Sequence, residues 1–221
     1  GQAAAVDATS KITITRDATL LTVPKVGASG LASGWYVPGQ GDTLSLFSAV
    51  SADVGDAGQL FTQLTLTVTG VSDADNEFLN IDGKPIPLKV GTGTGYTVTA
   101  ADGTLTITLD LDVFTTANSD LTNDDMVSLI QGMTYQHTGS DTAATTGQRT
   151  ITLTSASDDG ASNNQASLSL AATLTVTEFN KEPTLSATAT NPSFDKDVTG
   201  AVNLFSGVTV SAGAGQDSQT F

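Results

Sequence analysis

Alternation of Thr or Ser with aliphatic residues is the feature that most constrains this chain. Leu64–Val68 reads Leu-Thr-Leu-Thr-Val, and Thr104–Leu109 reads Thr-Leu-Thr-Ile-Thr-Leu. A period of two is typical of a strand with one buried face, and β-branched residues suit such a pleated surface. The pattern recurs at Lys11–Thr15, Thr19–Val23, Thr43–Phe47, Tyr96–Thr99, Thr150–Thr154, Ser167–Thr177 and Val208–Val210. The chain is therefore predicted to be an all-β protein.

Turn residues separate several of these strands. Asp82-Gly83 lies between Phe78–Ile81 and Ile86–Leu88, and Asp102-Gly103 precedes Thr104–Leu109. Asp-Gly pairs readily adopt the positive φ angles that two-residue hairpins need. Both pairs therefore predict tight hairpins.

One segment departs from the strand pattern and predicts a single short helix over about 122–131. Met126, Leu129, Ile130 and Met133 are spaced as the apolar stripe of a helix. Thr122 and Asp125 form a capping-box pattern, and Gly132 is expected to end the helix in the left-handed conformation.

Composition excludes several classes of function. The 221 residues carry a net charge of −15 and no cysteine. Nucleic-acid binding needs a basic surface, which is absent, and an anionic membrane surface would repel the chain. No stretch approaches the length of a membrane-spanning helix. Nucleic acid and membrane insertion are thus not expected, and disulfides and cysteine-bound metals are excluded.

The sequence repeats part of itself. Leu46–Val50 (Leu-Phe-Ser-Ala-Val) recurs as Leu204–Val208 (Leu-Phe-Ser-Gly-Val), 158 positions later. Such spacing predicts a tandem array. We expect strands from the end of a preceding module at 1–27, one complete sandwich at 28–180 and an incomplete next repeat at 181–221. Pro183 marks the linker between the last two, because proline cannot continue a central strand.

Several short motifs in this order resemble a tandem module of giant bacterial surface proteins. They are Leu64–Val68, Leu79–Gly83, Met133–Gln136, Pro183–Leu185, Asn191–Phe194 and Val202–Ser206. The resemblance implies a Greek-key, Ig-like or cadherin-like β-sandwich of an extracellular adhesin or biofilm-matrix protein. It also implies an extended rod at the bacterial cell surface that is bound to calcium and contacts adjacent repeats or copies of the same protein.

Calcium is the strongest chemical hypothesis, because Ca²⁺ prefers carboxylate, amide and carbonyl oxygens in loops. Candidate ligands occur in one loop, at one strand end and in the linker: Asp73, Asp75, Asn76 and Glu77; Asp158 and Asp159; Glu178, Asn180 and Glu182. For the linker residues, this role follows from the resemblance to cadherin-like repeats. The alternative is that Asp and Asn are simply common loop residues.

No catalytic residues are predicted. His137 is the only histidine and is expected at the surface or at a strand edge. The leading hypothesis is a structural spacer or stalk repeat stiffened by calcium. Two alternatives stay open: a self-assembling fibre subunit that adds its C-terminal strands to another copy, and a carbohydrate-binding module that uses Trp35 on extracellular glycans.

Overall fold

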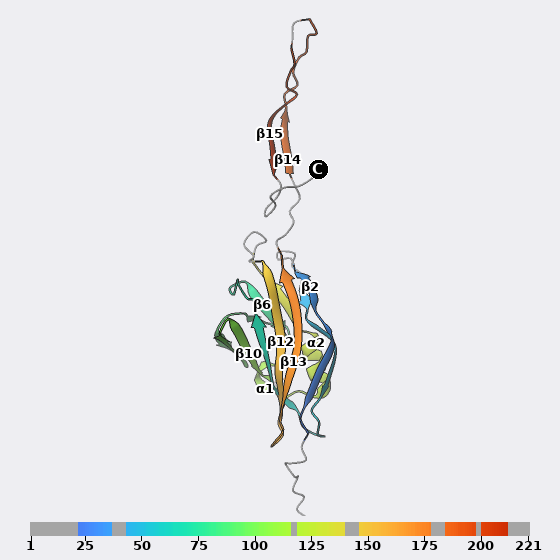
Figure 1. The fold of residues 1–221 in the computed structure, drawn as a ribbon, viewed down its shortest axis with the longest axis vertical. Coiled ribbons are helices and arrows are strands. Elements are labelled where there is room, and N and C mark those ends of the chain that lie inside the picture. Colours follow the sequence, from blue (N-terminus) through green and yellow to red (C-terminus); the bar gives the residue numbers. More distant parts are fainter. Residues whose placement is uncertain are drawn as a thin grey trace, which may run out of the picture.

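The computed structural model describes residues 22–36, 43–115, 119–139, 146–177, 184–197 and 200–211. Its strands are β1 Lys25–Leu31, β2 Ser33–Tyr36, β3 Leu44–Ser45, β4 Phe47–Asp53, β5 Phe61–Thr69, β6 Glu77–Ile81, β7 Lys84–Pro87, β8 Gly91–Gly93, β9 Tyr96–Ala101, β10 Thr104–Asp110, β11 Thr134–His137, β12 Gly147–Asp158, β13 Gln165–Val176, β14 Thr184–Ala189 and β15 Phe205–Ser211. The helices are α1 Leu111–Phe114 and α2 Asn123–Gln131. The prediction of a mostly β protein is confirmed (Figure 1).

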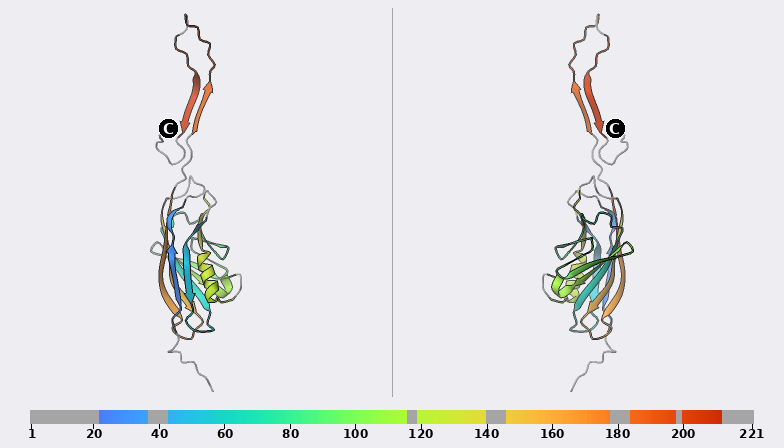
Figure 2. Two further views of the ribbon diagram at one scale, coloured as in Figure 1. Left: turned by 90° about the vertical axis from the view of Figure 1, so that its right-hand side faces the viewer. Right: turned by 90° about the vertical axis from the view of Figure 1, so that its left-hand side faces the viewer.

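The strands form a sandwich of several sheets. A seven-stranded sheet has the order β2-β13-β12-β5-β10-β9-β8. Facing it are a four-stranded sheet, β3-β11-β6-β7, and the β1-β4 pair. Figure 2 shows α2 on the side of the sandwich away from β12 and β13. The core lies between these layers.

Alternation decides which side chains enter the core. In β5, Leu64, Leu66 and Val68 are fully buried, while the Thr residues between them are half-buried. In β12, Ile151 and Leu153 are buried in the same way. Val68 pairs with Ile151 and Leu66 with Leu153, so the two strands present one continuous apolar face. The alternation of apolar residues and Thr in the sequence therefore matches the alternation of buried and half-buried side chains.

Both Asp-Gly hairpins are confirmed. Asp82 and Gly83 have φ angles of 50° and 70° and join β6 to β7, and Asp102 and Gly103 have φ angles of 49° and 75° and join β9 to β10. Asp tolerates the left-handed region and Gly occupies it freely, which explains why these pairs stand at the turns.

The predicted helix is present as α2, and its capping box is confirmed. The Thr122 side chain accepts a hydrogen bond from the backbone N–H of Asp125, whose carboxylate accepts one from the backbone of Thr122. Gly132 was expected to be left-handed, but its φ is −78° and its conformation is right-handed. Its N–H reaches Ser128 O at 3.0 Å, so a continued helical turn ends α2.

Two other expectations need correction. α1 is a second short helix, which the single-helix prediction missed because four residues are too few to show a helical period. β1 begins at Lys25 and therefore crosses the domain boundary expected at 27. It pairs with β4 from Lys25↔Asp53 to Leu31↔Phe47, so residues 25–27 belong to this sandwich.

The chain runs through the sandwich from one end to the other. At one end Thr22 donates its backbone N–H to Asp56 Oδ2 at 2.8 Å. The last long strand, β13, begins at that end and finishes at Val176 on the other. Neither helix in the described part of the chain has the length and apolar character needed to cross a membrane.

β14 and β15 form a separate two-stranded antiparallel sheet. Every residue of both strands is exposed. Figure 1 draws this hairpin apart from the sandwich.

Candidate functional site: a buried ion-pair network and an acidic end

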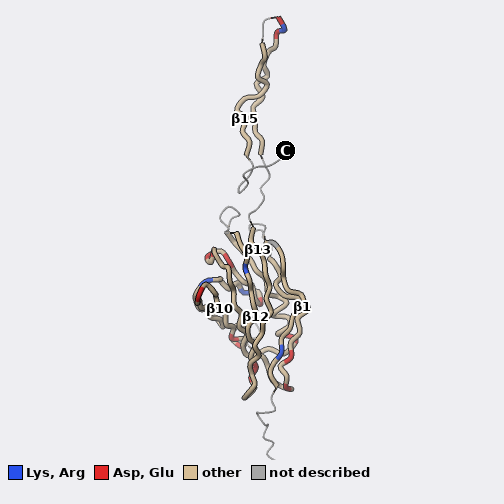
Figure 3. Tube along the Cα trace, viewed as in Figure 1, with Lys and Arg blue, Asp and Glu red and all other residues tan. Residues whose placement is uncertain are grey.

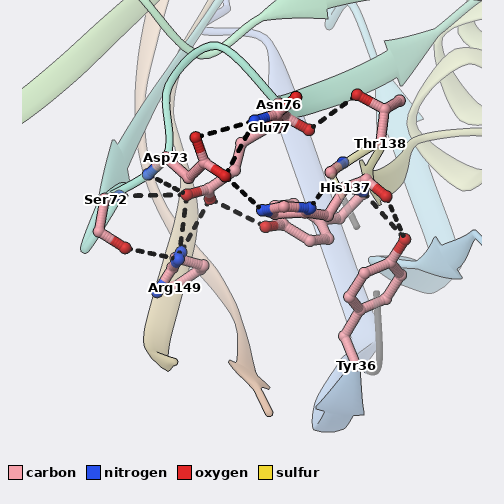
Figure 4. Close-up of polar contacts among 10 residues, drawn as sticks. Tyr36, Ser72, Asp73, Asn76, Glu77, His137, Thr138 and Arg149 are labelled. Carbon is pink, nitrogen blue, oxygen red and sulfur yellow. Dashed lines mark hydrogen bonds and ion pairs between the residues drawn. The ribbon is translucent and has the colours of Figure 1, made fainter. Parts of the chain in front are cut away.

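A buried ion pair connects the two layers of the sandwich (Figure 4). Arg149 lies in β12 of the seven-stranded sheet and Glu77 in β6 of the smaller one. Their side chains are 1% and 0% exposed. Arg149 Nε donates to Glu77 Oε2 at 2.8 Å and Nη2 donates to Oε1 at 3.0 Å. This two-point geometry is the strongest form of an arginine–carboxylate contact.

Three further donors surround the Glu77 carboxylate. The hydroxyl of Tyr135 donates to Oε2 at 2.8 Å, and the backbone N–H groups of Ser72 and Asp73 donate to Oε1 at 3.1 and 2.8 Å. Arg149 Nη2 also donates to Ser72 Oγ at 2.8 Å. Five donors therefore saturate the two oxygens of Glu77.

The hydrogen bonds of this network keep Glu77 and Arg149 ionised although both are buried. Burial alone would raise the pKa of Glu77, but the hydrogen bonds from Arg149, Asp73, Ser72 and Tyr135 together lower it below its usual value. Burial alone would lower the pKa of Arg149, and Glu77 reverses this to a rise. Burial and the charge of Glu77 also raise the pKa of Tyr135. A saturated, permanently charged and buried cluster is suited to holding the layers together.

His137 lies in the interior, which corrects the expectation of a surface or edge residue. It is 3% exposed, because it follows Tyr135 on the inward side of β11. Nδ1 accepts the N–H of Gly139 at 3.1 Å, which leaves the proton on Nε2. Nε2 lies 3.2 Å from Asp73 Oδ2, without the alignment of a hydrogen bond. The backbone N–H of His137 donates to the Tyr36 hydroxyl at 2.9 Å.

The loop predicted to bind calcium is engaged with the protein itself. Asn76 Nδ2 donates to both carboxylate oxygens of Asp73 at 3.0 Å, and Asp75 Oδ1 pairs with Lys89 Nζ at 2.9 Å in solvent. Together with the saturated Glu77, these contacts give the oxygens of this loop partners within the protein, and an ion bound here would have to replace them. The loop also anchors β6 to β11, since Thr138 donates its N–H to Asn76 O at 2.8 Å.

The opposite end of the sandwich holds Asp158 and Asp159, the second predicted pair. Asp158 is 3% exposed, and its Oδ1 accepts the N–H of Gly160 at 2.7 Å. Asp159 Oδ1 accepts the N–H of Leu60 at 3.0 Å. Within the described residues, Asp158 Oδ2 and Gln59 Oε1 are buried and have no hydrogen-bond partner. Two buried oxygens without a hydrogen-bond donor are energetically costly, so the polar groups at this end are not fully satisfied.

The side chains of Gln59 and Asp158 both approach Gly160. A Cβ atom at Gly160 would lie 2.5 Å from Gln59 Nε2 and 2.8 Å from Asp158 Oδ1. A larger residue at 160 would therefore displace the ends of these two side chains. Gln59 also lines a surface hollow of about 500 Å³, together with the acidic residues Asp53, Asp56 and Asp124.

Like charges accumulate at this end, which we call the acidic end (Asp53, Asp56, Asp110, Asp112, Asp120, Asp124, Asp158 and Asp159). Burial, followed by the charges of Asp159 and Asp56, raises the pKa of Asp158 against the hydrogen bond from Gly160. Burial and neighbouring carboxylates raise the pKa of Asp120. A hydrogen bond with Asp112 is the main cause of the raised pKa of Asp110. Figure 3 shows acidic residues in red near the lower end of the sandwich.

No group of three or more His, Cys, Asp or Glu side chains within the described residues is arranged to hold a metal ion by itself. An ion at the acidic end would therefore combine few carboxylates with amide, carbonyl or water oxygens, which Ca²⁺ accepts. The predicted linker ligands Glu178, Asn180 and Glu182 lie outside the described residues. The backbone of Trp35 is described in β2, whereas its side chain is not.

The sequence contained a signal for the network that the prediction did not use. Arg149 has the same strand parity as Ile151 and Leu153, and Glu77 has the same parity as Leu79 and Ile81. An arginine and a glutamate on inward positions of two strands require one another, because an unpaired buried charge is prohibitive. Gln59 and Asp56 had no comparable signal, because they lie in an irregular loop.

Comparison with known proteins gives no match to a protein-family model, a curated protein or a solved structure.

Proposed function

We propose that this chain is a structural spacer or stalk repeat of a secreted or cell-surface bacterial adhesin or matrix protein. The observation that carries the proposal is the path of the chain, which enters the sandwich at the Asp56 end and leaves it at the Val176 end. Modules joined in this way extend a rod end to end. At ~3.3 Å per residue, β13 with its 12 residues makes each module roughly 40 Å long.

The finer architecture belongs to the same proposal. Two facing layers of mostly antiparallel strands suit a Greek-key sandwich of the Ig-like or cadherin-like kind. The interior supports a mechanical role, since the charged cluster of Glu77, Arg149 and Tyr135 is sealed from solvent and ties the layers together.

Calcium at the acidic end completes the proposal. Asp158 Oδ2 and Gln59 Oε1 are buried acceptors without donors, and Asp56 and Asp159 contribute negative charge beside them. A hard divalent cation would satisfy both oxygens and offset the repulsion among the carboxylates. Asp158, Asp159, Gln59 and Asp56 are the residues that would hold it.

Thermal unfolding of the full chain in millimolar calcium, in magnesium and in excess EDTA tests the proposal. A calcium site occupied at about 100 times its Kd adds about 2.7 kcal/mol to the free energy of unfolding. We expect a rise of the melting temperature in calcium that magnesium does not reproduce, because Mg²⁺ requires a tighter octahedral site. Identical melts in all three solutions would remove calcium from the proposal.

Two substitutions locate the ion. Asp158→Asn should abolish the calcium-dependent rise, whereas Asp75→Asn should keep it, because Asp75 lies on the exposed loop beside Lys89. The reverse result would move the site to the loop at 73–77.

A further inference from the structure

We infer that residues 184–211 are the opening segment of a second sandwich, and that the exposed apolar face of β14 and β15 is a docking surface for the helix and sheets of a second copy of this module. The inference deepens the proposed stalk by naming the partner of this surface. It rests on the tandem arrangement and is independent of calcium.

Strand pairing in the two segments agrees next to the repeated motif and differs by one residue beyond a register shift between Ser186 and Thr188. In the sandwich Leu31 pairs with Phe47, and in the separate hairpin Ala189 pairs with Phe205. Each residue of the second pair lies 158 positions after its counterpart, and Thr188↔Ser206 matches Gly30↔Ser48 at the same offset, so β14 and β15 repeat the pairing of β1 and β4 at this end. The short motif repeated in the sequence is thus a repeat of a three-dimensional unit.

A backbone irregularity is repeated at the same offset. Ala49 in β4 has a φ of 49°, which is rare for alanine, and Gly207 in β15 has a φ of 58°. These residues also lie 158 positions apart. Two strands of unrelated origin would not share a left-handed residue at the same place in an equivalent pair.

Apolar side chains occupy equivalent positions with opposite burial. Tyr36, Leu46 and Phe47 are 4%, 0% and 2% exposed in the sandwich. Their counterparts 158 positions later, Phe194, Leu204 and Phe205, are 63%, 60% and 60% exposed. Three large apolar side chains thus stand in solvent at positions where the first module buries its own. A surface of this kind marks an interface.

The first module shows what covers this surface. Tyr36 packs edge-on against Tyr135 of β11 with ring centroids 5.0 Å apart. Leu46 donates its N–H to Met133 O at 3.0 Å, just after α2, and Thr173 of β13 donates to Ala32 O at 2.8 Å. The matching partner therefore offers a helix and strands equivalent to α2, β11 and β13, which residues 54–177 contain.

The test extends the chain at the equivalent position. Residue 211 corresponds to residue 53, so a copy of residues 54–177 is attached directly after Ser211. We expect a second cooperative unfolding unit, measured by calorimetry and by hydrogen exchange of residues 184–211. Phe205→Asp should remove the second unit and leave the first, while Phe47→Asp should do the opposite. Ser206→Asp is the matched control, because its counterpart Ser48 is exposed.

A second variant controls for misfolding that is caused only by the new junction after Ser211. In the original chain, residues 26–53 are replaced by a copy of residues 184–211, which has the same length. A cooperative melt of this exchange chain supports the inference, and failure of both chains to fold the tested unit overturns it. If the unmodified chain forms filaments and Phe205→Asp abolishes them, the inference is also overturned. Strand addition between copies is then the favoured explanation. Neither result depends on calcium, so failure here is distinct from failure of the calcium melt.

Discussion

Arg149 and Glu77 illustrate how single residues govern this sandwich. Both are buried, and each satisfies the charge that the other introduces. Burial of two charges is expensive, and the direct contact with its surrounding hydrogen bonds repays much of that cost. Their importance for stability therefore appears when one partner is removed and the other remains.

Arg149→Leu should lower the free energy of unfolding by about 3–5 kcal/mol, because Glu77 is left buried without its counter-charge. Denaturant unfolding at neutral pH measures this. Lys89→Ala is the matched control, since its ion pair with Asp75 is exposed and such pairs contribute about 0–1 kcal/mol. Equal small losses in the two variants would show that the buried pair has no special role.

Asp158→Asn should raise the melting temperature in EDTA at neutral pH. Burial and the charges of Asp159 and Asp56 raise the pKa of Asp158, so its ionised form is destabilising in the folded state when no cation is bound. The amide removes that charge. Asp102→Asn, on a distant exposed hairpin, should have little effect. A lower melting temperature for Asp158→Asn would contradict this account.

At the scale of elements, local sequence predicts much of this fold and fails at identifiable points. The period of two, the two Asp-Gly turns and the capping box of α2 are local signals, and each appears in the structure. The acidic end is different. Register shifts between Leu153 and Ser155, so the inward side of β12 passes from odd residues to Ala156 and Asp158. Nothing in the sequence marks that bulge.

The candidate site likewise has a part that the sequence predicts and a part that it does not. Asp158 and Asp159 were predicted as an acidic pair at a strand end, and in the structure Asp158 and Gln59 both approach Gly160 while Asp159 accepts the N–H of Leu60. Glu77 was singled out as a candidate calcium ligand, and its partner in the structure, Arg149, lies 72 positions away in β12. Pairing between distant strands sets such contacts, and sequence spacing does not encode it.

Thr122→Ala should destabilise the protein by about 1 kcal/mol, because α2 loses the side chain that caps its N-terminus. Thermal unfolding measures the loss. Ser128→Ala, at an exposed position of the same helix, is the control and should change stability by about 0.5 kcal/mol or less. Equal effects would show that the capping box contributes nothing beyond helix propensity.

For the whole molecule, opposite pKa shifts at the two ends set the response to pH. Asp158, Asp110 and Asp120 have raised pKa values, so the stability that they contribute is present below their ordinary value of 3.8 and is lost as pH rises through the folded-state pKa. Glu77 has a lowered pKa, so its contribution is present above the ordinary value of 4.5 and is lost as pH falls through the folded-state pKa.

In EDTA, the melting temperature should therefore rise as pH falls from neutral toward the raised pKa values of these aspartates, and decline as pH falls below 4.5 toward the lowered pKa of Glu77. Calcium should raise the melting temperature most at neutral pH and least in acid, because protons compete for the same oxygens. Melts over this pH range, with and without calcium, measure both effects. A calcium effect that is independent of pH would argue against carboxylate ligands.

The parallel pairing of β2 with β13 has a mechanical consequence. β2 belongs to the first part of the sandwich and β13 to the last, and they run side by side from Thr173↔Ser33 to Val176↔Tyr36. Tension applied through the two ends of the module pulls these strands in opposite directions along their length. Their hydrogen bonds are then loaded in shear and share the force, whereas a hairpin pulled open at its end breaks one bond after another. Force applied between the two ends of the sandwich would thus act along the direction in which the hydrogen bonds of β2 and β13 share the load.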